Sequence, residues 1–288
     1  MIRYQFMRFP EGRLKAVTFS YDDGVTQDAR FAQTLSRYGL KGTFNFNSDE
    51  LKKGRGISKE DAQALILDQG HEIAVHGYNH RALGLQRPLE GMRDVLDCRM
   101  ELEEKFGRIL RGMAYPDSGI TQFANGTRYE QIKQYLQELG IAYSRSLSAD
   151  NNKFLLPEDW YNWIPTAHHN NPKIFEWIEA FTALNAEELY PTRRYPRLFY
   201  IWGHSYEFDN NDNWDHLEKI CSTIGGKEDV WYATNIEIYD YVKAYESLVY
   251  SADGKLVYNP TLFTVWFTVD KALYSVAPGE TLNLRDKH

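Results

Sequence analysis

Strand-like and helix-like segments alternate along most of this chain of 288 residues. In residues 17–21, large apolar side chains alternate with small hydroxyl side chains, a pattern typical of a strand. Residues 26–38 carry apolar side chains at helical spacing, and Gly39 ends the predicted helix. About seven such units continue to residue 247, which predicts parallel strands with crossover helices. That number suits a closed α/β barrel better than an open sheet.

The remaining units follow the same pattern. Predicted strands cover residues 42–46, 72–75, 113–115, 141–144, 197–202 and 230–233. Predicted helices run from Ser58 to Gly70 and over residues 89–106, 128–139, 173–184, 214–223 and 235–247. A loop rich in Asn, Pro and Trp is expected at residues 148–172. No glycine-rich phosphate motif follows the first strand, which argues against a dinucleotide-binding fold.

The end of the chain has a different pattern. Short strand-like runs at residues 261–269 and 272–276 are flanked by Asp-Gly and Pro-Gly turn signals. We therefore predict one barrel domain, residues 1–247, followed by a short β-rich C-terminal extension, residues 248–288.

Bulk composition argues against several classes of protein. The net charge of −7 disfavours a nucleic-acid partner, and no apolar run is long enough for a membrane helix. The N-terminus lacks the apolar core of a secretory signal, so we expect a cytoplasmic protein. Cys98 and Cys221 have neither disulfide nor metal-site spacing. Aromatic residues make up 15% of the chain, which suits a large aromatic core or a groove that stacks on sugar rings.

Polar side chains follow the C-terminal ends of three predicted strands, where parallel barrels carry their chemistry. In chain order these strands lead to Asp22 and Asp23, to His76 and His80, and to His204. Alone, the aspartate pair could form a turn, and the His-x-x-x-His spacing could be an ordinary polar loop. Together, two imidazoles and one carboxylate offer three ligands to Zn²⁺ or a neighbouring first-row metal and leave a position open for water.

These motifs resemble those of the polysaccharide deacetylases, carbohydrate esterase family 4, which share the homology domain of the nodulation-factor chitooligosaccharide deacetylases. The resemblance extends over residues 15–245 and rests on three stretches. They are Thr18-Phe19-x-x-Asp22-Asp23-Gly24, Gly70-His71-Glu72-Ile73 followed by His76-x-x-x-His80, and the strand into His204. The fold that this resemblance implies is a distorted (β/α)7 barrel of the glycoside hydrolase/deacetylase type with a small C-terminal β appendage.

The resemblance also implies a role for each of these residues. Asp22 would be the catalytic base and His204 the general acid, and one divalent metal ion would bind to Asp23, His76 and His80. Zn²⁺ is the expected ion, with Co²⁺, Ni²⁺ and Mn²⁺ as alternatives. The implied reaction hydrolyses a non-peptide carbon–nitrogen bond. A metal-activated water, deprotonated by Asp22, removes the N-acetyl group of a saccharide, and His204 protonates the departing amine.

Three motifs depart from the family pattern. Gly77 stands where the family has Ser or Thr, so one loop hydrogen bond is absent. The third motif reads Ala-Tyr-Pro-Asp at residues 114–117 and lacks the arginine that orients the base. We predict that Arg145, at the end of the following strand, supplies this charge to Asp22. The fourth motif is blurred, with the Asp-Trp pair at residues 159–160 and a later tryptophan both eligible.

Four side chains near the predicted rim are candidates for binding substrate: Tyr115, Trp163, His168 and Trp202. The partner would be an N-acetylated saccharide or a related small amide, with saccharide length and oligomeric state left open. One alternative is hydrolysis of a linear or cyclic non-sugar amide on the same scaffold. Another is a carbohydrate-binding relative without turnover. A catalytically dead relative would be expected to lose a rim carboxylate or imidazole, so their presence favours an enzyme.

Overall fold

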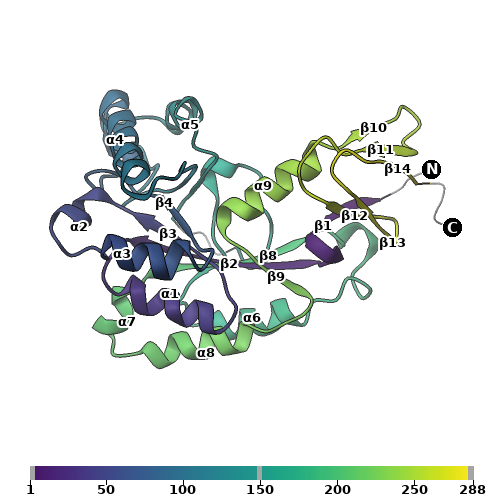
Figure 1. Cartoon of the computed structure of the whole chain (residues 1–288), viewed down its shortest axis with the longest axis horizontal. Coiled ribbons are helices and arrows are strands. Elements are labelled where there is room, and N and C mark those ends of the chain that lie inside the picture. The colour runs from purple at the N-terminus through teal and green to yellow at the C-terminus, as the bar shows by residue number, and fades with distance from the viewer. Residues whose placement is uncertain (1–3, 148–150, 285–288) are drawn as a thin grey trace.

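The computed structural model describes residues 4–147 and 151–284. Three short segments lie outside the described residues: 1–3 at the start of the predicted barrel domain, 148–150 in the predicted loop, and 285–288 at the end of the predicted C-terminal extension. Figure 1 shows an elongated molecule, with strands and flanking helices at one end and small β-sheets at the other. No helix in the described part of the chain has both the length and the apolar character needed to cross a bilayer.

A curled parallel sheet forms the larger part of the molecule. Its strands follow the order β6-β5-β4-β3-β2-β8-β7, and β9 pairs with the start of β2. They are β2 (Lys15–Asp23), β3 (Gly42–Phe46), β4 (Glu72–Val75), β5 (Gly112–Ala114), β6 (Tyr143–Arg145), β7 (Ala167–His168), β8 (Arg197–His204) and β9 (Val230–Tyr232). A parallel bridge between Arg145 and Trp163 connects β6 with the segment that leads to β7. The sheet thus forms the distorted (β/α)7 barrel that the resemblance implied.

Helices flank this sheet (Figure 1). They are α1 (Asp28–Arg37), α2 (Ser48–Lys52), α3 (Lys59–Asp61), α4 (Pro88–Phe106), α5 (Tyr129–Glu138), α6 (Ile174–Thr182), α7 (Tyr206–Asn210), α8 (Trp214–Ile224) and α9 (Asn235–Glu246). The Ser58 side chain caps α3 by accepting from the Asp61 backbone N–H, as its sequence position predicted. The helix then widens into a π-helical segment, Ala62–Leu67, which the sequence pattern did not indicate.

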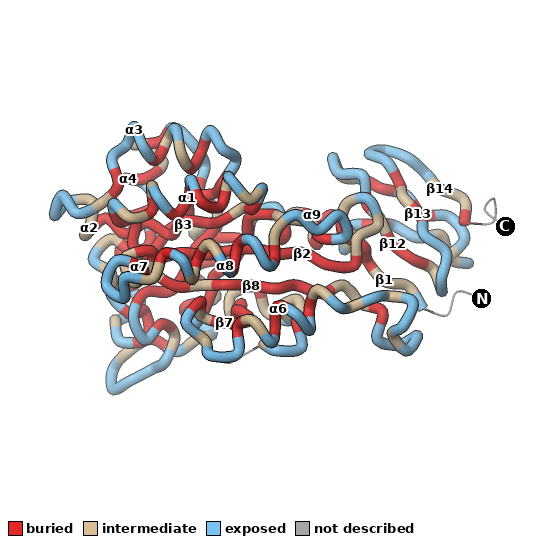
Figure 2. The backbone as a smooth tube through the Cα atoms, turned by 90° about the horizontal axis from the view of Figure 1, so that it is seen from below, coloured by how far each residue is buried: buried red, intermediate tan, exposed pale blue. Residues whose placement is uncertain are grey.

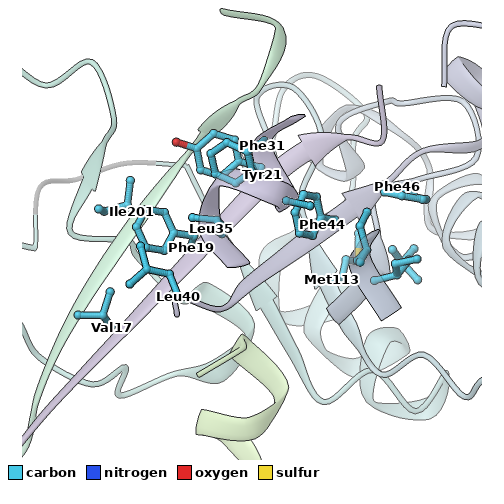
Figure 3. Close-up of a cluster of buried hydrophobic side chains, with 14 of the residues drawn as sticks. Val17, Phe19, Tyr21, Phe31, Leu35, Leu40, Phe44, Phe46, Met113 and Ile201 are labelled. Atoms are coloured by element: carbon cyan, nitrogen blue, oxygen red, sulfur yellow. The ribbon is translucent and has the colours of Figure 1, made fainter. Parts of the chain in front are cut away.

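β2 is a central strand, and all nine of its residues are buried (Figure 2). Its large side chains pack against the helical layer. The Tyr21 ring centroid lies 3.7 Å from that of Phe31 on α1, and Phe31 meets Phe44 of β3 edge-on at 5.9 Å (Figure 3). Burying one such side chain stabilises the fold by roughly 1.5–3 kcal/mol. The small polar side chains alternate with these, and Ser20 accepts a hydrogen bond from Asn45 at 2.8 Å.

Three element boundaries differ from the predicted ones and affect the site. β8 continues as far as His204, so this imidazole belongs to the last residue of the strand. β6 is shifted and ends at Arg145. The predicted loop at residues 148–172 contains β7, which pairs with β8. Strand pairing therefore fixes the positions of all these side chains.

The C-terminal strands form two small sheets, and the first strand of the chain joins one of them. The sheets consist of β1 (Gln5–Arg8), β12 (Val265–Val269) and β13 (Ala272–Val276), and of β10 (Val249–Tyr250), β11 (Leu256–Tyr258) and β14 (Thr281–Asn283). Apolar side chains such as Val257 and Phe267 form their shared buried cluster. The sequence did not predict β1, whose antiparallel pairing with β12 ties the start of the chain to the appendage. The division at residue 247 stays a prediction.

Candidate active site

Two adjacent carboxylates end β2 and point to different neighbours. Asp22 is 2% exposed and Asp23 is 9% exposed. The Asn45 amide donates to Asp22 Oδ1 at 2.9 Å, and the Asn47 amide donates to Asp23 Oδ1 at 2.8 Å. Asp23 has a φ of +86°, a conformation that non-glycine residues rarely adopt and that is often found at functional sites. The strand end therefore holds two separately oriented acids.

Arg145 of β6 binds Asp22. Its Nη2 donates to Asp22 Oδ2, and the guanidinium is fully buried above the Trp202 ring, 4.7 Å from the centroid. Burial by itself would raise the pKa of Asp22, but Arg145, His76 and His204 together hold it below its ordinary value. Asp22 is therefore an ionised carboxylate although its side chain is buried. The structure brings Arg145 to the predicted place, and its role stays a prediction.

The side chains of Asp23, His76 and His80 form a compact group of three potential metal ligands, whose ligand atoms all lie within 4.8 Å of one another. Asp23 Oδ1 lies 3.3 Å from His80 Nε2 and 3.7 Å from His76 Nε2. Ligand atoms around a tetrahedral first-row metal lie about 3.4 Å apart, so this spacing fits one ion.

The chemistry of these ligands also fits a cation. His76 Nδ1 donates a hydrogen bond to the Ala114 carbonyl oxygen at 2.9 Å, which leaves Nε2 as the free ligand atom. Burial lowers the pKa of His76, even though Asp22 and Asp23 oppose this effect. A neutral imidazole is the form that binds a metal.

His204 faces Asp22 on one side and an unpredicted glutamate on the other. Its Nε2 lies 4.0 Å from Asp22 Oδ2, and its Nδ1 lies 2.8 Å from Glu207 Oε1 in the first turn of α7. The other oxygen of Glu207 lies 3.3 Å from His168 Nε2 and 3.1 Å from His169 Nε2. Burial opposes ionisation of Glu207, but the three imidazoles lower its pKa.

Glu207 also changes the titration of His204. Burial by itself would lower the pKa of His204, but Glu207 together with Asp22 and Asp23 raises it. Sequence reasoning missed Glu207, although its three-residue spacing from His204 at a helix start was the available signal. The motif-four candidate Asp159 accepts hydrogen bonds from Tyr129 and Lys133 instead.

The predicted substrate contacts fall into two groups. Tyr115 and Trp163 are 1% and 0% exposed, and the Tyr115 hydroxyl donates to the Tyr161 carbonyl oxygen at 2.8 Å. Neither ring offers a free face, so both belong to the packing and we do not assign them to substrate binding. His168 and Trp202 are partly exposed, with ring centroids 4.8 Å apart. These two remain candidates.

A cavity of about 620 Å³ opens beside the metal-ligand group. Asp23 forms part of its wall, together with polar side chains from the loops after β2 and β3 and from α7. Tyr206 of α7 also lines it, with its ring centroid 5.0 Å from that of His204. The Arg55 guanidinium in the wall is paired with Glu50, so these two charges offset each other. The wall is therefore polar, and the Asp23 carboxylate is its remaining charge.

Comparisons with known proteins agree with this fold. Residues 10–143 match the family described as polysaccharide deacetylase. A structure described as a polysaccharide deacetylase from Mycobacterium smegmatis is 18% identical, with a TM-score of 0.57 over 83% of this chain and 94% of that chain. A mutant of the peptidoglycan deacetylase PdaC from Bacillus subtilis is 14% identical, with a TM-score of 0.50 over 81% and 94% of the two chains.

A third structure comes from a protein described as a pseudoenzyme. It is a mutant, with restored enzymatic activity, of a carbohydrate esterase family 4 pseudoenzyme from Bacillus anthracis. It is 12% identical, with a TM-score of 0.50 over 82% of this chain and 70% of that chain. No curated protein matches the sequence. The match to the polysaccharide deacetylase family therefore covers a little under half of the chain, and the solved structures agree with it in fold.

Proposed function

We propose that this protein is a metal-dependent hydrolase that removes N-acetyl groups from a saccharide. The observation that carries the proposal is the position of Asp22. It is buried, kept ionised by Arg145, and 3.9 Å from His76 of the metal-ligand group. A fixed carboxylate beside a potential metal site is the arrangement that a general base requires.

Asp23, His76 and His80 would hold the ion, with Zn²⁺ expected and Co²⁺, Ni²⁺ or Mn²⁺ as alternatives. When bound, a divalent cation lowers the pKa of water and polarises a carbonyl oxygen. Asn47, which donates to Asp23, and the Ala114 carbonyl, which accepts from His76, would orient the ligands. The donor set thus supports a catalytic site with an open coordination position.

The protein's own residues would move two protons. Asp22 Oδ2 takes a proton from the attacking water as the new carbon–oxygen bond forms. His204 Nε2 then gives a proton to the amide nitrogen as the carbon–nitrogen bond breaks, which releases acetate and a free amine. The Glu207 carboxylate accepts a hydrogen bond from His204 Nδ1, and this contact orients Nε2 toward Asp22. Arg145 keeps Asp22 ionised and in place.

The polar cavity beside Asp23 favours a saccharide over a small non-sugar amide. Its volume of about 620 Å³ accommodates more than the reacting acetamide group, and its wall offers polar side chains such as Thr26 and Gln27 to hydroxyl groups. The presence of Asp22, Asp23, His76 and His204 favours turnover over binding alone.

Acetate release provides the test. Purified protein is analysed for bound metal and assayed for acetate release on chito-oligosaccharides and peptidoglycan fragments, and for ring opening on a cyclic ureide, with and without added Zn²⁺, Co²⁺ or Ni²⁺. We expect metal-dependent acetate release, and a decrease in kcat/KM of about 10²–10⁴-fold in Asp22→Asn. Asp159→Asn serves as the control and should retain activity. Acetate release that survives Asp22→Asn would contradict the mechanism, and a protein that neither binds metal nor responds to it would favour a binding function.

A further inference from the structure

The loop between the two imidazole ligands has an unusual backbone. Gly77 and His80 have φ values of +84° and +51°, so the chain passes twice through the left-handed region within four residues. Such a conformation costs free energy at a non-glycine residue and persists only where neighbouring groups stabilise it. The position of the His80 ring therefore depends on what binds this loop.

A buried carboxylate from α4 binds it. Asp94 is 3% exposed, and its Oδ1 accepts from the backbone N–H and the side-chain amide of Asn79, both at 2.9 Å. Its Oδ2 accepts from the Tyr78 N–H at 3.1 Å. Three donors from two consecutive loop residues thus converge on one side chain of a long helix. Hydrogen bonds to an ionised acceptor are about twice as strong as neutral ones.

The glycine at position 77 fits this arrangement. A Cβ atom placed on Gly77 would lie 2.7 Å from Asp94 Oδ2. The carboxylate therefore occupies the space into which a side chain at this position would project. Gly77 stands where the family has Ser or Thr, so this chain has no hydroxyl group at that position to bind the loop. The Asp94 carboxylate accepts hydrogen bonds from the loop instead.

We propose that Asp94 is a positioning residue for the metal site, which it serves by holding the loop that carries His80. The inference rests on the proposed metal site and adds a residue to it. Asp94 contacts neither the cation nor the substrate. It fixes the two residues before His80, whose Nε2 lies 3.3 Å from Asp23 Oδ1, and so keeps this ligand preorganised. Loss of such a partner typically weakens metal binding about 10–100-fold.

The test is a competition titration with a chromophoric chelator, which gives the dissociation constants of Zn²⁺ and Co²⁺ without an activity assay. Asp94→Asn has nearly the same shape, but its NH₂ group would face a loop N–H, and we expect the Kd to rise about 10–100-fold. Asp97→Asn, three residues further along α4 with a side chain 40% exposed, is the matched control and should leave the Kd unchanged. Asn79→Ala removes only one of the three bonds and should raise the Kd about two- to fivefold.

A double variant separates positioning from general stability. If Asp94 acts through His80, Asp94→Asn will change the Kd little in the His80→Ala background. An unchanged Kd in Asp94→Asn, or a lower melting temperature of the metal-free protein with the same Kd, would overturn the inference, as would an undiminished effect in the His80→Ala background. Wild-type protein that binds no metal would instead refute the proposed function. Asn79→Ala keeps the inference testable if Asp94→Asn does not fold.

Discussion

Two buried carboxylates, Asp22 and Glu72, stand on strands of the same sheet in opposite electrostatic surroundings. Asp22 lies at the C-terminal end of β2 and Glu72 at the start of β4. Among the described residues, Glu72 accepts hydrogen bonds from neutral donors alone: the hydroxyl groups of Tyr143 and Thr43, at 2.7 and 2.8 Å, and the Ile236 N–H at 2.9 Å. Asp22 binds the guanidinium of Arg145.

The difference shows what keeps a buried acid ionised in this protein. Burial raises the pKa of Glu72 to about 7, although Tyr143 and Thr43 donate to it. The pKa of Asp22 is lowered despite burial, because Arg145 and two imidazoles surround it. Neutral hydrogen bonds thus offset only part of the desolvation, whereas a cation reverses its effect. Asp22, at the end of β2, is thus stabilised by charge, whereas Glu72, at the start of β4, is held by neutral hydrogen bonds.

Removing the Arg145 guanidinium that pairs with Asp22 should have the largest effect on stability and turnover. Arg145→Met keeps much of the packing volume but leaves a buried carboxylate without its partner. We expect the free energy of unfolding to fall by about 3–5 kcal/mol and kcat/KM to fall about a hundredfold. Urea unfolding and acetate release measure the two effects. Arg111→Met, which breaks a half-exposed pair with Asp240, should cost at most about 1 kcal/mol.

A double-variant cycle checks the cause of this loss. In the Asp22→Asn background, Arg145→Met should cost little or even stabilise the fold, because it removes a buried guanidinium that has already lost its partner. Equal costs in both backgrounds would mean that Arg145 stabilises the fold by packing alone. Unchanged turnover in the single variant would remove Arg145 from the proposed site.

Glu72 should make stability depend on pH in the opposite sense from a paired acid. Folding raises the pKa of Glu72 from 4.5 to about 7. The contribution of the protonated carboxyl group to the free energy of unfolding is therefore fully present below pH 4.5 and is lost as the pH rises through about 7. The loss amounts to about 3 kcal/mol. Glu72→Gln should abolish it, as urea unfolding at pH 5 and pH 8 would show. The exposed Glu179→Gln should keep the wild-type pH dependence. Parallel pH curves for wild type and Glu72→Gln would contradict the comparison.

Glu207→Gln tests whether the Glu207 carboxylate also controls the protonation of the His204 imidazole. Glu207 helps to raise the pKa of His204 against the effect of burial, so the variant should lower it. Because the proposed acid must be protonated, kcat/KM would then begin to fall at a lower pH, with a decrease of about tenfold at pH 8. Asp209→Asn on the same helix, whose side chain binds Trp214 and Gln27, is the control. An alkaline limb that does not move would separate Glu207 from the acid.

The sequence was sufficient to locate the strand ends and the acids and imidazoles that follow them. Parallel strands place their C-terminal ends together, so Asp22, His76 and His204 could be assigned to one rim without coordinates. Arg145 was predicted by the same rule, since it ends a strand near a motif that lacks an arginine. The spacing of apolar side chains and the order of the strands can both be read from the sequence, and this part of the prediction rests on them.

Contacts between distant segments could not be predicted in this way. Glu207 meets His168 and His169 only because β7 pairs with β8 inside a segment that reads as a loop. Trp163 was a candidate for stacking on substrate, but it is buried in the segment that the bridge to Arg145 holds. β1 pairs with β12 across nearly the whole chain. In each case tertiary packing determines which residues meet, and the local sequence pattern does not predict this.

The smallest effect sharpens the comparison at Glu72. Tyr143→Phe removes one neutral donor, whose hydroxyl lies 2.7 Å from Glu72 Oε1. We expect a loss of about 1 kcal/mol at pH 5 and about 1.5 kcal/mol at pH 8, because the bond is stronger when the acceptor is ionised. Tyr161→Phe removes a hydroxyl that donates to the Ile141 carbonyl oxygen at 2.6 Å, and its cost should be the same at both pH values. Equal pH dependence in the two variants, measured by urea unfolding, would mean that Glu72 does not change its charge in this range.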